Sequence, residues 1–105
     1  MNAEASPRAF KVAVLGGTGR QGFGLALRWA AAGVPVAVGS RDPSRAVEAT
    51  QRIARSLERA GKPPAAGLAG LTNAEAASWA DAAVLTVPAS ALEALLQPLA
   101  PVLVQ

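Results

Sequence analysis

The stretch KVAVLGGTGRQGFGLALRWAAAGVPVAVGSRD, residues 11 to 42, joins two apolar runs through a cluster of glycines. Five of the nine residues from position 16 to position 24 are glycine. Glycine loses more conformational freedom on folding than any other residue, so such a cluster needs a local reason. Gly17, Gly19 and Gly22 form the pattern G-x-G-x-x-G, directly after a strand pattern and at the start of a helical one. In this setting the pattern predicts a loop that holds the pyrophosphate of a dinucleotide.

Each glycine of the pattern has its own part in that prediction. The first allows a tight turn, the second lets the ligand approach the backbone, and the third lets the helix pack closely on the strand. The free N–H groups at the positive end of the helix then face the phosphates. We expect the loop contacts to the cofactor to come from Gly17, Thr18, Gly19, Arg20, Gln21 and Gly22. The alternative is a tight turn that binds nothing.

The end of the second apolar run indicates which dinucleotide is bound. A site that prefers NAD places Asp or Glu about 20 residues past the loop, where the carboxylate accepts hydrogen bonds from the ribose 2′-hydroxyl. This chain has Gly39, Ser40 and Arg41 there. A guanidinium can bind a 2′-phosphate through two hydrogen bonds and a serine can add a hydroxyl, so NADP is favoured over NAD. Arg45 is a further candidate for the same phosphate, and the alternative for either arginine is an exposed side chain without a ligand.

Apolar runs bounded by Gly and Pro alternate with helical patterns along the chain. Strands are expected at residues 10–15, 34–38, 66–71, 81–87 and 101–105, and helices at about 20–32, 43–60, 72–79 and 91–97. Asp42 and Thr72 are expected N-caps, the second in a capping box with Glu75, while Gly33 and Gly61 end helices. This alternation predicts an α/β fold with a doubly wound parallel sheet, a Rossmann-like NAD(P)-binding fold of strand order 3-2-1-4-5.

The composition is that of a single globular domain. The chain has 105 residues, of which 51% are hydrophobic, and we expect a flexible N-terminal lead over residues 1–9 and a dinucleotide-binding domain over residues 10–105. No apolar run is long enough for a membrane span and the first residues lack the apolar centre of a secretory signal, so a cytoplasmic protein is expected. The absence of His and Cys removes thiol chemistry and the usual neutral-pH base. Neither a metal site nor a catalytic side chain is predicted.

The net charge of +3 raises the question of a nucleic-acid partner. Five of the ten cations fall within residues 41–59. Glu48 and Glu58 lie among them, at helical spacings from Arg52 and Arg55 that are typical of a solvated helix face. We therefore expect no nucleic-acid partner.

Taken together, the motifs resemble the NADPH-dependent coenzyme F-420 reductases, also called F-420:NADP oxidoreductases. The resemblance rests on VAVLGGTGRQGFGLALRWAAAG, VGSRD and TNAEAASWADAAVLTVP, which cover most of residues 11 to 88. It implies that Thr18, Ser40, Arg41 and Arg45 recognise the 2′-phosphate of NADP(H). It also implies hydride exchange between C4 of the nicotinamide and C5 of the deazaflavin coenzyme F-420, a transfer that needs two rings held face to face and no protein nucleophile.

The nicotinamide end of the site is expected where the first and fourth strands diverge. Thr86, Val87 and Pro88 lie there, and the alternative is ordinary packing at a strand end. The resemblance implies an aromatic residue after the proline, whereas this chain has Ala89 and Ser90. It also implies a longer protein, so that this chain is expected to be the N-terminal, NADP-binding half of a full-length form that is a homodimer. Alone, it is expected to bind NADPH without turnover.

Other functions stay open at this point. The chain could belong to a reductase of another acceptor, such as an imine, a ketoacid or a flavin, or be a non-catalytic NADP-binding module. The remaining alternative is an α/β domain whose glycine loop no longer binds a nucleotide. Trp29 and Trp79 lie late on their helices, so we expect them to pack in a core or an interface and not to stack on a cofactor ring.

Overall fold

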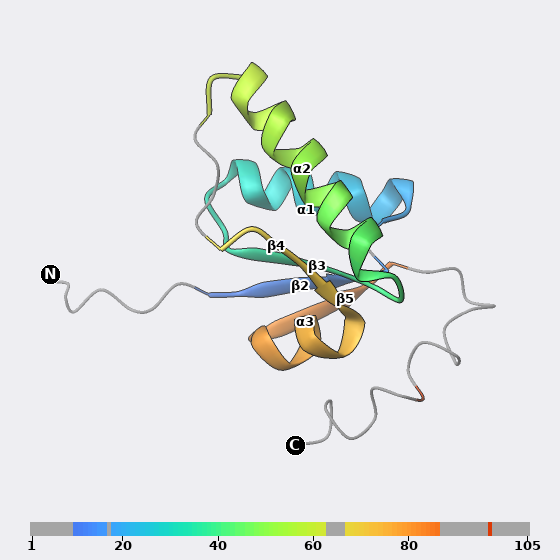
Figure 1. Ribbon diagram of the computed structural model, residues 1–105. Coiled ribbons are helices and arrows are strands. Elements are labelled where there is room, and N and C mark those ends of the chain that lie inside the picture. Colours follow the sequence, from blue (N-terminus) through green and yellow to red (C-terminus); the bar gives the residue numbers. More distant parts are fainter. Residues whose placement is uncertain (1–9, 17, 63–66, 87–96, 98–105) are drawn as a thin grey trace, which may run out of the picture.

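The computed structural model describes residues 10–16, 18–62, 67–86 and 97, and these form a sheet with helices on both faces (Figure 1). In chain order the elements are β2 (Val12–Leu15), α1 (Arg20–Ala31), β3 (Val36–Ser40), α2 (Pro43–Arg59), β4 (Ala69–Thr72), α3 (Asn73–Trp79) and β5 (Ala82–Leu85). The predicted α/β class is confirmed.

The sheet has four parallel strands in the order β4-β3-β2-β5. Numbered along the chain, this is 3-2-1-4, as predicted for the first four strands. The predicted fifth strand, residues 101–105, lies outside the described residues, as do all but the last residue of the helix expected at 91–97. In register, Leu15 at the end of β2 lies beside Gly39 of β3 and Leu85 of β5. The carboxyl ends of these three strands therefore meet at one edge of the sheet.

The helices cover the two faces of the sheet separately, α1 and α2 on one face and α3 on the other (Figure 1). Successive side chains of a strand point to opposite faces, so each strand contributes to two core layers. Val14, Val36 and Val38 pack in the layer beneath α1 and α2. Ala13, Leu15 and Ala37 pack in the layer that includes Ala76 of α3. Since both faces of β2 and β3 are buried, these strands read as continuous apolar runs.

The two tryptophans pack as expected. Trp29 of α1 lies against the first core layer and Trp79 of α3 lies against the second. The Lys11 ammonium lies 5.2 Å from the centre of the Trp79 ring. Within the described residues both side chains thus belong to the packing of helices on the sheet.

The strand boundaries differ from the predicted ones, and the difference in β3 affects where Ser40 lies. This strand was expected at 34–38 but runs from Val36 to Ser40. Pro35 has no N–H to donate to the sheet, and its carbonyl instead accepts a hydrogen bond of 3.0 Å from the Val12 N–H. The shift makes Gly39 and Ser40 part of the strand. Ser40 is therefore held by the sheet itself. The other strands are shorter than their predicted ranges, and β4 in addition ends one residue later than predicted.

Helix ends follow the predicted signals. The Asp42 side chain accepts a hydrogen bond from the Ser44 N–H at the start of α2, and Thr72 and Glu75 form a complete capping box at the start of α3. Gly33 and Gly61 follow α1 and α2 with φ angles of 86° and 71°, a conformation that favours glycine. Among the described helices, none is both long and apolar enough to span a bilayer.

Candidate dinucleotide-binding site

The loop after β2 presents an uncapped helix end. Gly16 has a φ of 72° and turns the chain away from the strand. Gly19 is the N-cap of α1, and the helix begins with a hydrogen bond of 2.8 Å from the Phe23 N–H to the Gly19 carbonyl. Gly19 has no side chain that could cap this end, and the first turn holds no acidic residue. The first N–H groups of α1 are therefore suited to an anionic ligand.

The glycines that the structure describes fit the predicted cradle. Among the described residues, a Cβ placed on Gly19 would have only the Gly16 carbonyl oxygen, at 4.0 Å, as a close neighbour. Protein packing therefore does not require glycine at this position, and the missing side chain leaves the backbone open to a ligand. Gly22 is buried in α1, as expected for the residue that brings the helix close to the sheet. Gly17 lies outside the described residues.

The end of β3 brings the second group of predicted residues to the same edge. The Ser40 side chain is 7% exposed, and its Oγ accepts a hydrogen bond of 3.2 Å from the Asp42 N–H. Arg41 and Arg45 are exposed. Because Leu15 and Gly39 are in register, Gly16 follows β2 next to the place where Ser40 ends β3. The structure thus brings the glycine loop and the Ser40–Arg41 pair together.

Thr86 approaches the loop from the other side. It follows β5, and its backbone N–H donates to the Leu15 carbonyl over 3.1 Å. Its hydroxyl lies 2.9 Å from the Leu15 carbonyl oxygen and 3.2 Å from that of Gly16. Thr86 therefore holds the start of the loop in addition to its predicted place beside the nicotinamide. Val87 and Pro88 lie outside the described residues.

The sequence analysis missed one residue of this edge. Asn73, the first residue of α3, is 8% exposed, and its Oδ1 accepts a hydrogen bond of 3.2 Å from the Gly16 N–H. In the sequence it stands inside the TNAE capping box and reads as an ordinary helix start. The sequence carries no short-range signal for this contact, because it joins two residues that lie 57 positions apart.

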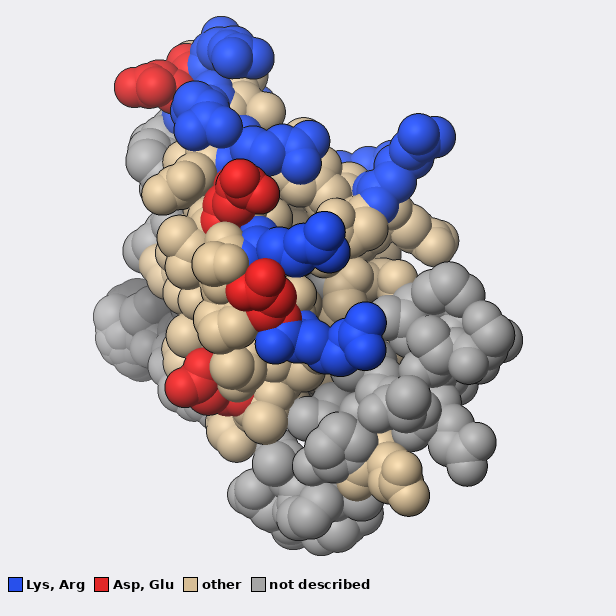
Figure 2. Space-filling model, turned by 45° about the vertical axis from the view of Figure 1, so that its right-hand side comes forward, with Lys and Arg blue, Asp and Glu red and all other residues tan. Residues whose placement is uncertain are grey.

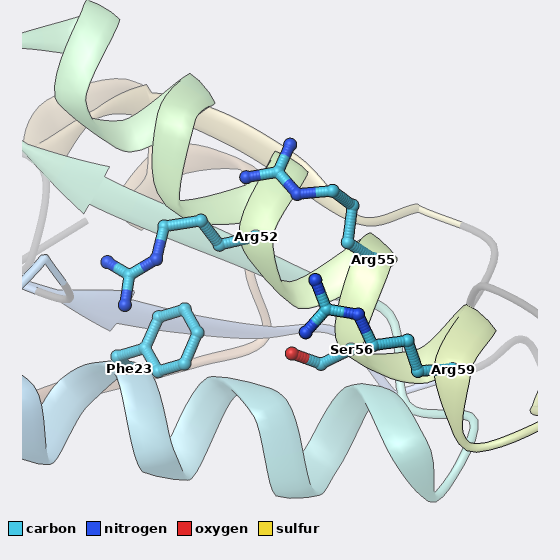
Figure 3. A pocket seen from close by; sticks show the side chains of 5 residues that line it. All are labelled: Phe23, Arg52, Arg55, Ser56 and Arg59. Atoms are coloured by element: carbon cyan, nitrogen blue, oxygen red, sulfur yellow. The ribbon is translucent and has the colours of Figure 1, made fainter.

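A separate basic surface lies between α1 and α2. The helix α2 exposes Arg45, Arg52, Arg55 and Arg59 together with Glu48 and Glu58. Figure 2 shows basic side chains interleaved with acidic ones on one face of the molecule. Phe23, Arg52, Arg55, Ser56 and Arg59 line a pocket of about 240 Å³ (Figure 3), in which the Arg52 guanidinium lies 4.5 Å from the centre of the Phe23 ring. None of the described residues of the predicted cofactor site lines this pocket. Arg59 lies in the last turn of α2, where its charge stabilises the negative end of the helix.

Comparison with known proteins decides the family. Residues 11–104 match the family described as "NADP oxidoreductase coenzyme F420-dependent". The chain belongs to this family. Its relatives include proteins named "F420-dependent NADP reductase" from Methanothermobacter marburgensis, which is 52% identical over 86 residues, and from Methanocaldococcus jannaschii, which is 42% identical over 78 residues. These matches cover 82% and 74% of this chain but 37% and 34% of the two relatives. The chain therefore spans about a third of the length of the curated relatives that it matches.

Family membership confirms the resemblance that the motifs indicated. The matched segment includes the glycine loop, the Ser40–Arg41 pair and Thr86. Within the described residues, no group of three or more His, Cys, Asp or Glu side chains could hold a metal ion. The predicted site is made of a glycine loop, hydroxyls and guanidinium groups, and its contacts with a cofactor stay a prediction.

Asp42 occupies the position closest to that of the acidic residue of an NAD site, but its carboxylate is already engaged. Its Oδ1 lies 2.6 Å from the Ser44 hydroxyl and 3.0 Å from the Ser44 N–H. These two hydrogen bonds lower the pKa of Asp42 from its ordinary value of 3.8, and the bond from the Ser44 hydroxyl has the larger effect. The side chain therefore serves the N-terminus of α2, as the capping pattern predicted.

Ser44→Ala is expected to raise the pKa of Asp42 toward 3.8 because it removes the main cause of the lowering. A depressed carboxyl pKa stabilises the fold above the unfolded-state value, and this contribution is lost as the pH falls through the folded-state pKa. The variant should therefore lose part of that contribution in neutral solution. NMR titration of the Asp42 carboxyl carbon measures the pKa. Ser78→Ala, on the exposed surface of α3, is the control. An unchanged Asp42 pKa in Ser44→Ala would contradict the assignment.

Proposed function

We propose that this chain is the NADP(H)-binding part of an F-420-dependent NADP reductase, an oxidoreductase that passes hydride between NADPH and coenzyme F-420. The main support is that an open glycine loop and the Ser40–Arg41 pair lie at the same edge of the sheet. The carboxylate that follows Arg41 in the sequence, that of Asp42, is held by Ser44. The names of the relatives give the same two cofactors.

In this proposal, each part of the cofactor is bound by a different group of residues. The N–H groups of the loop, from Gly17 to Gly22, bind the pyrophosphate, and Arg20 and Gln21 border it. Thr18, Ser40, Arg41 and Arg45 bind the 2′-phosphate. The Ser40 hydroxyl suits this role because its oxygen already accepts the Asp42 N–H and its proton has no acceptor among the described residues. Thr86, Val87 and Pro88 border the nicotinamide.

Hydride transfer requires that the protein position the two rings, and it requires no acid–base side chain. When bound, NADPH carries the hydride at C4 of its nicotinamide, and C5 of the deazaflavin receives it. Holding two reactants in the correct geometry can contribute about 7–11 kcal/mol toward a barrier. Thr86 hydrogen-bonds the loop start, so it fixes the nicotinamide end of the site relative to the pyrophosphate end. The homodimer of the full-length protein, its cytoplasmic location and the absence of a nucleic-acid partner are further parts of the proposal, supported by the resemblance and the charge pattern.

Calorimetric titration of the chain with NADP⁺ and NAD⁺ tests the binding half of the proposal, and NADP⁺ is expected to bind more tightly. Hydride transfer is tested on the protein that contains this chain, with NADPH and oxidised F-420, by the loss of deazaflavin absorbance. Reduction of an imine, a ketoacid or a flavin in place of F-420 would assign a different acceptor. Tight NADPH binding without reduction of any acceptor would indicate a binding module.

A further inference from the structure

The start of the glycine loop is held from two neighbouring elements. On one side, the Asn73 side chain of α3 accepts the Gly16 N–H at 3.2 Å. On the other side, the Thr86 hydroxyl lies 3.2 Å from the Gly16 carbonyl oxygen. Gly16 thus has both backbone polar groups within hydrogen-bonding distance of side chains that lie 57 and 70 residues away in sequence. The residue fixed in this way begins the predicted pyrophosphate turn.

The same Asn73 side chain also fills the space above Gly39. A Cβ on Gly39 would lie 2.8 Å from the Asn73 Oδ1, which is closer than real Cβ atoms come to a neighbour. It would also lie 3.0 Å from the Leu15 Cδ2 and 3.1 Å from the Asn73 Cα, both tight contacts. Glycine at position 39 therefore makes room for Asn73, whereas Gly19 leaves its surroundings open. The glycine that precedes Ser40 and Arg41 is explained by a protein side chain and not by a ligand.

One buried amide thus contacts both parts of the predicted cofactor site. Asn73 hydrogen-bonds the residue that starts the glycine loop and packs on the residue that precedes Ser40. Its side chain is 8% exposed, so its position is set by the packing of α3 on β2 and β3. A ligand that spans pyrophosphate and 2′-phosphate needs a constant distance between those two parts, and a preorganised site binds more tightly because less order is lost on binding.

We propose that Asn73 is a positioning residue for the dinucleotide: its amide sets the glycine loop and the end of β3 relative to one another before the coenzyme binds. The inference rests on the proposed NADP(H) function and adds a residue that does not itself touch the coenzyme. Asn73→Ala should free the Gly16 N–H, loosen the loop start and weaken NADP⁺ binding roughly tenfold, the scale of one lost hydrogen bond.

Two measurements on the 105-residue chain test this role. Calorimetry gives the NADP⁺ dissociation constant, and amide hydrogen exchange of Gly16 without ligand reports the hydrogen bond itself. Asn73→Asp keeps an Oδ1 acceptor, so slow exchange of the Gly16 N–H should return in that variant. Gly39→Ala, which presses on the same amide, should weaken NADP⁺ binding in the same direction. In the double variant with Asn73→Ala the two losses should be less than additive.

Thr50→Ala is the matched control. Thr50 is also 8% exposed, and its hydroxyl donates to the Val47 carbonyl at 2.7 Å within α2. It should lower thermal stability while leaving the NADP⁺ dissociation constant and Gly16 exchange unchanged.

The outcomes separate the inference from the function on which it rests. Weaker NADP⁺ binding and faster Gly16 exchange in Asn73→Ala, with neither change in Thr50→Ala, would support it. NADP⁺ binding within about twofold of the wild type in Asn73→Ala would overturn the inference alone. Wild-type protein that binds neither coenzyme would overturn the proposed function as well, and that result is visible before any variant is made.

Discussion

Arg41→Ala is expected to weaken NADPH binding by about 10- to 150-fold, the range of one charge-assisted hydrogen bond to a phosphate, while NADH binding changes by less than about twofold. Only NADPH carries the 2′-phosphate, so a side chain that grips this group affects one coenzyme and not the other. Arg41 directly follows Ser40 at the end of β3 and is exposed, so its guanidinium is free to reach a ligand at this edge. Calorimetric titration of both coenzymes measures the difference.

Arg59→Ala is the control for the Arg41 variant, because it removes the same charge from the last turn of α2, where the side chain lines the pocket beside Phe23. It should leave both affinities unchanged. Arg45→Ala should weaken NADPH binding less than Arg41→Ala does and more than Arg59→Ala does, since Arg45 lies one helical turn beyond Arg41. Equal losses of NADPH and NADH binding in Arg41→Ala would remove Arg41 from the 2′-phosphate site and with it the main reason to prefer NADP.

The fold could be predicted because its signals are local, and the expected position of the site was read from the same signals. Strand, glycine loop and helix follow one another within residues 11 to 31, and the Asp42 and Thr72 caps each depend on partners within three residues. Alternation of such units leads to a parallel sheet with few possible topologies. The carboxyl edge of the sheet then follows as the expected binding edge.

The parts that could not be predicted depend on contacts between distant segments. The sequence analysis interpreted Gly39 as the place of a missing carboxylate, but its local cause is the Asn73 side chain. No short-range pattern states that the first side chain of α3 meets the loop after β2, because that depends on how α3 crosses the sheet. The start of β3 was misplaced for a related reason, since Pro35 gives its carbonyl to Val12 from outside the strand.

Gly70→Ala is expected to destabilise the fold by about 2–3 kcal/mol or more, the upper part of the range for overpacked cores. Gly70 lies in β4 directly beneath the first turn of α2. A Cβ there would lie 2.5 Å from the Val47 nitrogen and 2.6 Å from the Ala46 carbonyl oxygen. Both are backbone atoms, so no side chain can turn away to make room. The helix would have to lift from the sheet.

The Gly70 variant also bears on the site, because the turn of α2 that would lift carries Arg45 and follows the Asp42 cap. A fall in melting temperature of roughly 10–20 °C is expected from the loss of stability. Gly24→Ala is the control: a Cβ there meets nothing within 4 Å, and Ala within a helix should stabilise α1 by about 0.5–1 kcal/mol. Melting curves of the wild type, Gly70→Ala and Gly24→Ala measure the change in melting temperature at each glycine. If Gly70→Ala melted at the same temperature as the wild type, α2 would not rest on β4 as closely as the structure has it, and the proposed role of Arg45 at the 2′-phosphate would lose its support.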